Sequence, residues 1–364
     1  MKNKILIIIF LFTLENGSFS QAIYLDSLHS VLDTTGDISA RAKLLYKIGT
    51  SYGYQNIDSS THYMRQVITV TSDKRLKTDA YQWLSALFKF SRPDSTFYYG
   101  NLGLKLAREN AFDDVQPSIF INFAITEHAI GNAAQAVQFA LEAVKLAEET
   151  NNFFNQAYAT SVLGMALIIS GSYEKAISSE KQSFEYFYAQ EGFFNASISL
   201  SFIALSYAHL NLRDSTIYYT QKALSILPQQ SKPQYLPSDI IGNTYFQIGD
   251  YPEALKHFRT SSKSPELYVR FNGTLSIAEI YQFQNVSDSA LFYGEQALEV
   301  AEQSGFYSSI IRANTFLSKI YTSLDPKEGI QYAQDALAYK DSLAAMERGM
   351  NIADFLDDDI LLIN

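Results

Sequence analysis

Small residues recur along the chain at a spacing of 36 to 40 residues, within a repeated frame of apolar and aromatic positions. The first small position is filled in eight copies by Ser60, Thr96, Ala136, Ala176, Thr216, Ala254, Ala290 and Gly329. Seven residues later each copy has a second small or slim residue: Val67, Gly103, Ala143, Ser183, Ala223, Ser261, Ala297 and Ala336. Positions seven apart share one face of a helix, and small side chains there let a neighbouring helix approach closely. The pattern predicts eight antiparallel helix pairs over residues 40–337, preceded by one helix near residues 23–32.

Helix starts and breaks agree with this frame. Four of the second helices are expected to begin at Asp-Ser dipeptides, which start at Asp58, Asp94, Asp214 and Asp288. An aspartate at a helix start accepts hydrogen bonds from free backbone N–H groups and suits the positive end of the helix dipole. All eight prolines fall between the expected helices or in a first turn. Because no segment shows sustained two-residue alternation with hairpin turns, the sequence predicts an all-α fold.

The frame resembles the tetratricopeptide repeat (TPR). One copy combines Leu163-Gly164, Gly171-Ser172-Tyr173 and Ala176, and another combines Gly242, Tyr245 and Ala254. The resemblance covers residues 40–340 and implies a right-handed TPR-like α-solenoid of about eight helix-turn-helix units, which bury their apolar faces on one another. The spacing near 40 matches the longer-helix variety of the repeat. The family's tryptophan position is unfilled in most units, and Glu127 stands where tyrosine is usual.

The N-terminus has the layout of a secretory signal peptide. A basic start with Lys2 and Lys4 is followed by an apolar run from Ile5 to Leu14, and Ser18 and Ser20 suit a cleavage site before Gln21. The run is too short for a stable membrane anchor. We therefore expect a signal peptide at 1–20, a capping helix at 21–39, a solenoid at 40–340, and a C-terminal helix and tail at 341–364. The product is expected to be exported, to the periplasm of a Gram-negative cell, with no stable membrane insertion after cleavage.

Two phrases resemble the exported TPR sensor regions of bacterial histidine kinases and LuxR-type regulators. They are Leu25-Asp26-Ser27-Leu28 near the N-terminus and Tyr339-Lys340-Asp341-Ser342-Leu343 near the C-terminus. This resemblance implies a sensor half without its output domain, with a membrane sensor kinase or regulator as a partner in signal transduction. The alternative is a nutrient-uptake TPR protein associated with an envelope transporter. Such a lipoprotein needs a cysteine just after the signal peptide, and the sequence has none.

Composition and charge exclude several other functions. The chain of 364 residues has a net charge of −10 and no cysteine, which argues against binding to nucleic acid or anionic lipid and excludes disulfides and thiolate metal sites. Its five histidines lie at least 33 residues apart, so no zinc motif exists, and no phosphate-binding or nucleophile motif is present. We expect no enzyme activity, no catalytic residue, no metal and no cofactor. The high tyrosine and phenylalanine content is expected to fill space between helices.

Recognition of a protein or peptide is the function that the repeats favour. In TPR proteins the first helix of each pair lines a concave groove. The corresponding positions of the central units predict an apolar groove with few charges, lined by Ile121, Ile125, Tyr158, Met165, Ile168, Leu205, Asp239, Asn243 and Phe246. Apolar patches with sparse polar anchors are typical of protein-binding surfaces, although the same residues could instead be buried between units. The basic clamp of chaperone-binding TPRs is absent, because Asp239, Asn272 and Ser276 occupy its basic positions.

Overall fold

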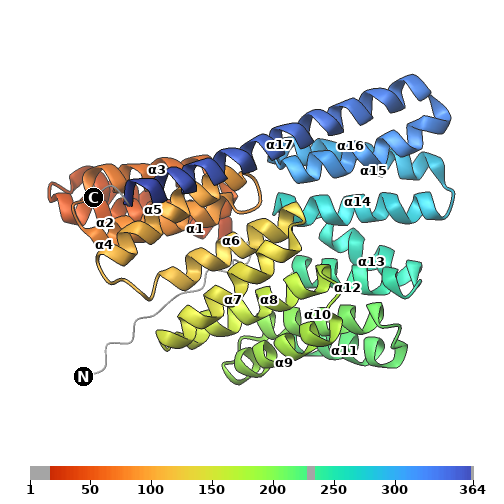
Figure 1. Ribbon diagram of the computed structural model, residues 1–364, viewed down its shortest axis with the longest axis horizontal. Helices are drawn as coiled ribbons and strands as arrows, with labels where there is room; N and C mark the ends of the chain where they lie inside the picture. Colours follow the sequence, from red (N-terminus) through yellow and green to blue (C-terminus); the bar gives the residue numbers. More distant parts are fainter. Residues whose placement is uncertain (1–16, 228–233, 362–364) are drawn as a thin grey trace.

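The computed structural model describes residues 17–227 and 234–361, and this part of the chain contains only helices and their connections (Figure 1). Helix α1 (Gly17–Thr34) precedes the repeats. The first, or A, helices of the pairs are α2 (Ile38–Tyr52), α4 (Lys74–Phe88), α6 (Gln116–Ile130), α8 (Phe153–Ile169), α10 (Phe193–His209), α12 (Tyr235–Gln247), α14 (Leu267–Phe283) and α16 (Tyr307–Leu324). The second, or B, helices are α3 (Ile57–Val70), α5 (Pro93–Glu109), α7 (Ala133–Glu149), α9 (Tyr173–Ala189), α11 (Arg213–Ile226), α13 (Tyr251–Ser261), α15 (Ser287–Ser304) and α17 (Pro326–Leu361). A short 3-10 turn (Gly53–Gln55) joins α2 to α3. Eight helix pairs after one leading helix confirm the predicted architecture.

Both recurring small positions lie where helices meet. All eight residues at the first position and all eight at the second are buried. In the eighth unit the first small position is Gly329. A Cβ added to Gly329 would lie 2.9 Å from the backbone nitrogen of Thr322 in α16, so only glycine fits there without a shift. In the first unit the same position is Ser60, whose hydroxyl donates a hydrogen bond to the Gly49 carbonyl of α2 at 2.7 Å. The small residues therefore set how closely paired helices approach.

Left-handed residues repeat in the turns between A and B helices. One residue in the turn that follows the A helix has a positive φ in five successive units: Gly131, Gly171, Asn211, Gly249 and Asn285. Glycine and asparagine are the residues that adopt this conformation at least cost. Each Asp-Ser dipeptide begins two residues after the N-cap of its helix, because the N-cap positions are Asn56, Arg92, Leu212 and Val286. The aspartates therefore sit in the first turn and favour the helix dipole, while the capping role that the sequence suggested for them is wrong.

Stacked aromatic pairs join the two helices of most units. The A-helix ring lies 5.3 to 6.0 Å from the B-helix ring in the pairs Tyr52–Tyr63, Phe88–Tyr99, Tyr207–Tyr219, Tyr245–His257, Tyr281–Tyr293 and Tyr321–Tyr332. In the third and fourth units these positions hold Glu127 with Phe139 and Leu167 with Ser179. Offset stacking adds stability beyond the area it buries. The abundance of aromatic residues thus has a packing cause, as predicted.

The two ends of the repeat array contact each other. The ring of Phe90, just after α4, stacks on Tyr268 in the first turn of α14, with centroids 4.5 Å apart. Helix α17 runs back from α16 and packs against α5, so that the blue C-terminal helix lies alongside the orange helix α5 in Figure 1. Units seven and eight thereby touch unit two. The array closes on itself instead of remaining an open superhelix.

The predicted targeting segment is described only in part. Residues 1–16 lie outside the described residues, and Gly17 to Ser20 form the start of α1. The expected C-terminal helix is continuous with the last repeat, since α17 extends from Pro326 to Leu361 without a break. None of the helices in the described residues is both long enough and apolar enough to span a membrane.

Candidate functional site

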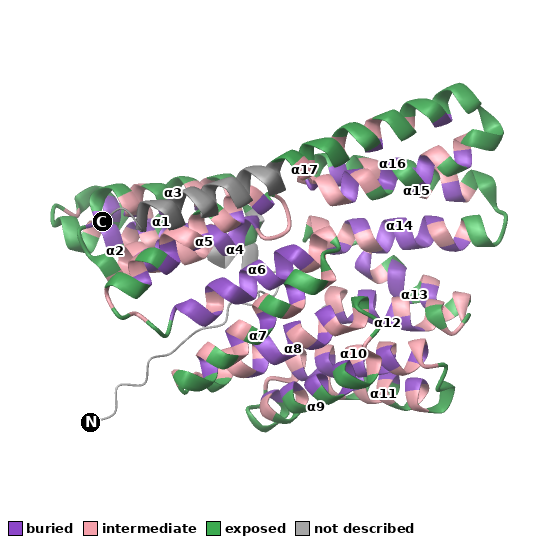
Figure 2. Cartoon of the chain, in the orientation of Figure 1, coloured by how far each residue is buried: buried purple, intermediate pink, exposed green. Residues whose placement is uncertain are grey.

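All nine predicted groove residues lie on A helices, but they differ in accessibility. Ile121 and Ile125 of α6 are buried in a core cluster that includes Val162 of α8, so they serve packing and offer no free surface. Tyr158 and Met165 of α8 are half-buried against the same cluster. Figure 2 shows the corresponding purple colour along most of α6. The inner surface at α6 is therefore core, contrary to the expectation of an open apolar groove there.

The remaining predicted residues lie further along the array. Ile168, Leu205, Asn243 and Phe246 are each partly exposed, whereas Asp239 is buried. Phe246 contacts the ring of Tyr251 with centroids 5.8 Å apart, and the Asn243 amide donates to the backbone carbonyl of Asp239 at 2.9 Å. These residues bring apolar surface and one carboxyl group onto neighbouring helices α8, α10 and α12. Whether they bind a ligand stays a prediction.

Asp239 is the most unusual polar residue of this surface. Its side chain is 8% exposed, and its buried Oδ1 atom has no hydrogen-bond partner among the described residues. Burial raises the pKa of Asp239 to about 7, although the charge of Arg312 and a hydrogen bond from Ser261 act in the opposite direction. Buried polar atoms in folded proteins nearly always have a partner, so an unpaired carboxylate oxygen requires an explanation.

Arg312 of α16 is the cation whose charge lowers the pKa of Asp239. Its Nη1 donates to Oδ1 of Asn272 at 2.7 Å, and its guanidinium lies 5.1 Å from the ring centroid of Phe271. Among the described residues no ion pair within 4.0 Å joins Arg312 to Asp239. Tyr268 also interacts with Asn272, and burial raises its pKa. Arg312 is thus held by α14 and leaves the Asp239 oxygen unpaired.

A second carboxyl group accompanies Asp239 on this side of the array. Burial raises the pKa of Glu279 in α14, and the charges of Arg312 and Lys319 partly offset the shift. The inner surface of units six to eight therefore combines two partly desolvated carboxyl groups with two cations of α16. These residues of α14 and α16 lie beyond the central units for which the sequence predicts a groove with few charges. We refer to Asp239, Asn272, Glu279 and Arg312 as the inner polar site.

The contact between the two ends of the array lies next to this site. The ammonium of Lys89 is 5.4 Å from the ring centroids of both Tyr54 and Phe90, and it is attracted by Glu266 at the start of α14. Phe90 stacks on Tyr268, which itself interacts with Asn272 and Asp239. We call Lys89, Phe90, Glu266 and Tyr268 the closing contact. It connects the N-terminal units physically to the inner polar site.

Another buried carboxyl group has a purely structural environment. Glu180 of α9 is fully buried and accepts hydrogen bonds from the Ser161 hydroxyl at 2.9 and 3.2 Å. A Cβ added to Gly164 would lie 2.6 Å from its Oε1, which shows how tightly the group is enclosed. Burial raises the pKa of Glu180 well above its ordinary value. Glu180 therefore contributes to the packing of α8 on α9.

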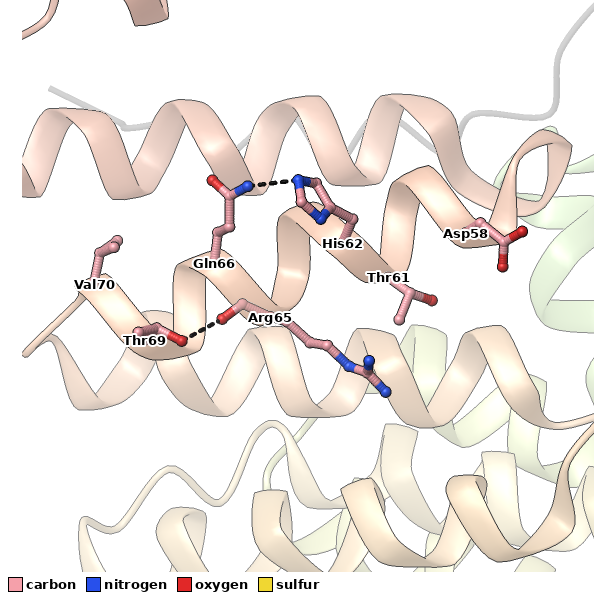
Figure 3. Close-up of a pocket in the computed structure, with 7 residues that line it drawn as sticks. All are labelled: Asp58, Thr61, His62, Arg65, Gln66, Thr69 and Val70. Carbon is pink, nitrogen blue, oxygen red and sulfur yellow. Dashed lines mark hydrogen bonds between the residues drawn. The ribbon is translucent and has the colours of Figure 1, made fainter.

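A shallow hollow also lies on α3. It is lined by Asp58, Thr61, His62, Arg65, Gln66, Thr69 and Val70. Figure 3 shows His62 and Gln66, joined by a 2.7 Å hydrogen bond, pointing away from the side on which Arg65 and Thr61 lie. Its polar groups do not converge on one point. Nowhere in the described part of the chain do three or more histidine, aspartate or glutamate side chains gather as a metal site would require.

Comparisons with known proteins agree on the architecture. No protein-family model matches the sequence, and no curated protein matches it. A Rap protein complexed with Competence and Sporulation Factor superposes with a TM-score of 0.57 at 12% identity, covering 80% of this chain and 88% of that chain. The apo form of the quorum sensor NprR from B. thuringiensis gives 0.55 at 13% identity, over 89% and 94% of the two chains. A monomeric mutant of IFIT1 with Gppp-AAAA gives 0.50 at 13% identity, over 89% and 78%.

The fold is that of a TPR-like solenoid. Within it, sequence reasoning missed Arg312, Glu279 and the closing contact. Arg312 could have been found by extending the repeat frame, because it stands 40 residues after Asn272 and occupies the matching position of the next A helix. Nothing local in the sequence marks Phe90 or Tyr268, since their contact joins units that are far apart along the solenoid.

Proposed function

We propose that this solenoid is a non-enzymatic scaffold that binds a protein or peptide on its inner surface, in a signalling role outside the cytoplasm. The observation that carries the proposal is the inner face of α8, α10 and α12. There the partly exposed side chains of Ile168, Leu205 and Phe246 lie on helices neighbouring a buried carboxylate oxygen without a partner. Apolar contact area supplies affinity for a peptide, and a few polar groups fix its position.

The comparisons supply a precedent for this arrangement. A Rap protein has been solved with Competence and Sporulation Factor, and NprR is a quorum sensor, so solenoids of this shape occur in signalling proteins. The enclosed state of Glu180 supports a binding role over a catalytic one, since this deeply buried acid has no space for a reacting molecule.

Selection of random peptides displayed on phage against the whole chain tests the proposal. Leu205→Arg places a long charged side chain on the inner face, and Phe246→Ala removes an aromatic contact. We expect both to weaken the selected peptides about tenfold, the loss typical of a central contact residue. The measurement is fluorescence anisotropy with labelled synthetic peptides.

The matched control is Leu141→Arg, because Leu141 lies on the B helix α7 with 52% of its surface exposed. This variant should bind the peptides as the wild type does. Circular-dichroism melts of all three variants separate loss of binding from loss of fold. Peptides that bind equally well to Leu205→Arg, Phe246→Ala and the wild type would contradict a binding surface on the inner face.

Export is a separate part of the proposal and has its own test. The basic start, the apolar run from Ile5 to Leu14 and the serines at 18 and 20 predict cleavage before Gln21. N-terminal sequencing of the protein recovered from a Gram-negative host should begin at Gln21 or within two residues of it. Replacing Ile8 and Ile9 with lysine should block processing, because a signal peptide needs an uninterrupted apolar centre. An intact Met1 on the wild-type protein would contradict export.

A further inference from the structure

We propose that the ligand of this surface is a basic peptide, whose ammonium or guanidinium group pairs with the Asp239 carboxylate at the inner polar site. The inference rests on the proposed function and names the chemistry of the partner. It begins from the Oδ1 atom of Asp239, which is buried without a hydrogen-bond partner in a side chain that is 8% exposed. An ionised carboxylate in such a place is stabilised most by a cation that also donates hydrogen bonds.

The residues around Asp239 do not supply that cation. Arg312 is the candidate within the chain, but its Nη1 is engaged with Asn272 and its guanidinium lies over Phe271. Asn243 donates to the backbone carbonyl of Asp239 and not to the carboxylate. Ser261 hydrogen-bonds to the carboxyl group, yet Oδ1 keeps no partner among the described residues, and because it is buried, a donor from a ligand reaches it only when the side chains around it move. The raised pKa of Asp239 agrees, because a group paired with a cation would have its pKa lowered.

The charges of the surroundings favour a cationic ligand over an anionic one. Glu279, whose pKa is also raised by burial, adds a second carboxyl group to the site, and Arg312 and Lys319 of α16 offset these two negative charges locally, so the preference for a cation comes from the chain as a whole. The chain as a whole has a net charge of −10. Such a field attracts basic peptides and repels acidic ones. The apolar residues Ile168, Leu205 and Phe246 on α8, α10 and α12 would receive the apolar side chains of the same peptide.

The test is a double-mutant cycle with synthetic peptides taken from the phage selection. We expect the selected sequences to be enriched in lysine and arginine. Asp239→Asn keeps the shape of the side chain and removes its charge, and it should weaken a lysine-containing peptide about tenfold. The same peptide with glutamine in place of that lysine should bind Asp239→Asn and the wild type within about twofold of each other. Asp214→Asn, at an exposed position of α11, is the control and should leave both affinities unchanged.

Arg312→Gln removes a positive charge beside Asp239, and its effect on peptide affinity should be opposite in sign to that of Asp239→Asn. If the ligand is cationic, removing this neighbouring positive charge should leave its affinity unchanged or increase it. If the ligand is anionic, the same variant should weaken binding, and the selected peptides should be rich in aspartate and glutamate. That result would overturn the inference.

The outcomes distinguish this inference from the proposed function. One outcome would refute the basic ligand but support the binding surface: the selected peptides contain no basic residue, bind Leu205→Arg more weakly than the wild type, and bind Asp239→Asn as tightly as the wild type. If the peptides bind both variants as tightly as the wild type, both the basic ligand and the binding surface are refuted. Melting temperatures of Asp239→Asn and Arg312→Gln that are no lower than that of the wild type would show that the affinities report on the site and not on loss of folding.

Discussion

Replacing Ala254 with arginine is expected to unfold the units around α13. Ala254 is completely buried and packs in a cluster with Phe258, Ile277 and Ile280 of α13 and α14. A long side chain does not fit there, and an unpaired buried charge costs several kcal/mol. That cost is a large part of the total stability of an ordinary domain. Because each unit is stabilised mainly by its neighbours, the loss should spread to α12 and α14.

Thermal melting followed by circular dichroism measures this effect, and hydrogen exchange locates it. Leu141→Arg is the matched control, since the same side chain at an exposed position of α7 should melt like the wild type. Ala254→Gly creates no overlap and should cost only about 1 kcal/mol, the usual difference between glycine and alanine within a helix. An Ala254→Arg protein with a normal melt would refute the close pairing of helices that the small positions imply.

Replacing Asp239 with asparagine is expected to make the protein more stable at pH 8 and to reduce the dependence of its stability on pH. Burial raises the pKa of Asp239 from 3.8 to about 7 in the folded state. Between these values the folded chain binds more protons than the unfolded chain, so the free energy of unfolding falls as the pH rises. The full shift corresponds to an ionisation penalty on the order of 4 kcal/mol above pH 7.

Chemical denaturation of the wild type and Asp239→Asn at pH 4 and at pH 8 measures this difference. The variant should be the more stable protein at pH 8, and the gap should shrink toward pH 4, where the wild-type carboxyl is protonated. Glu180, whose pKa is also raised, contributes equally to both proteins and cancels in the comparison. A gap that grows as the pH falls would show that Asp239 is stabilised as a carboxylate, against its assignment as an unpaired buried acid.

These two results bear on different parts of the molecule. The Ala254→Arg variant tests how closely one unit packs on the next, which depends on the size of a single side chain. Asp239 tests a group that lowers stability at neutral pH. Under the proposed function, the ligand would supply the partner that the Asp239 carboxyl group lacks. The closing contact of Lys89 and Phe90 joins unit two to α14, the helix that carries Asn272 and Glu279 of the inner polar site.

The sequence by itself determined the repeat, the helix pairs and their buried faces. Ala254, Ala290 and Gly329 could be placed between helices because local spacing and side-chain size decide which face of a helix permits close approach. The positions of Asp239 and Asn243 on the inner face follow from the same periodicity. Each of these features depends on residues that are neighbours in one hairpin, and such short-range relations can be read directly from the chain.

The tertiary structure alone decided which inner residues are accessible and what faces Asp239. Ile121 and Ile125 satisfy the groove pattern as well as Leu205 does, yet they are buried in the core of units three and four. The stacking of Phe90 on Tyr268 joins residues 178 positions apart. The physical reason is that the small rotation between successive units accumulates over the whole array. Where unit two meets unit seven is therefore the sum of many packing angles, and no single motif encodes it.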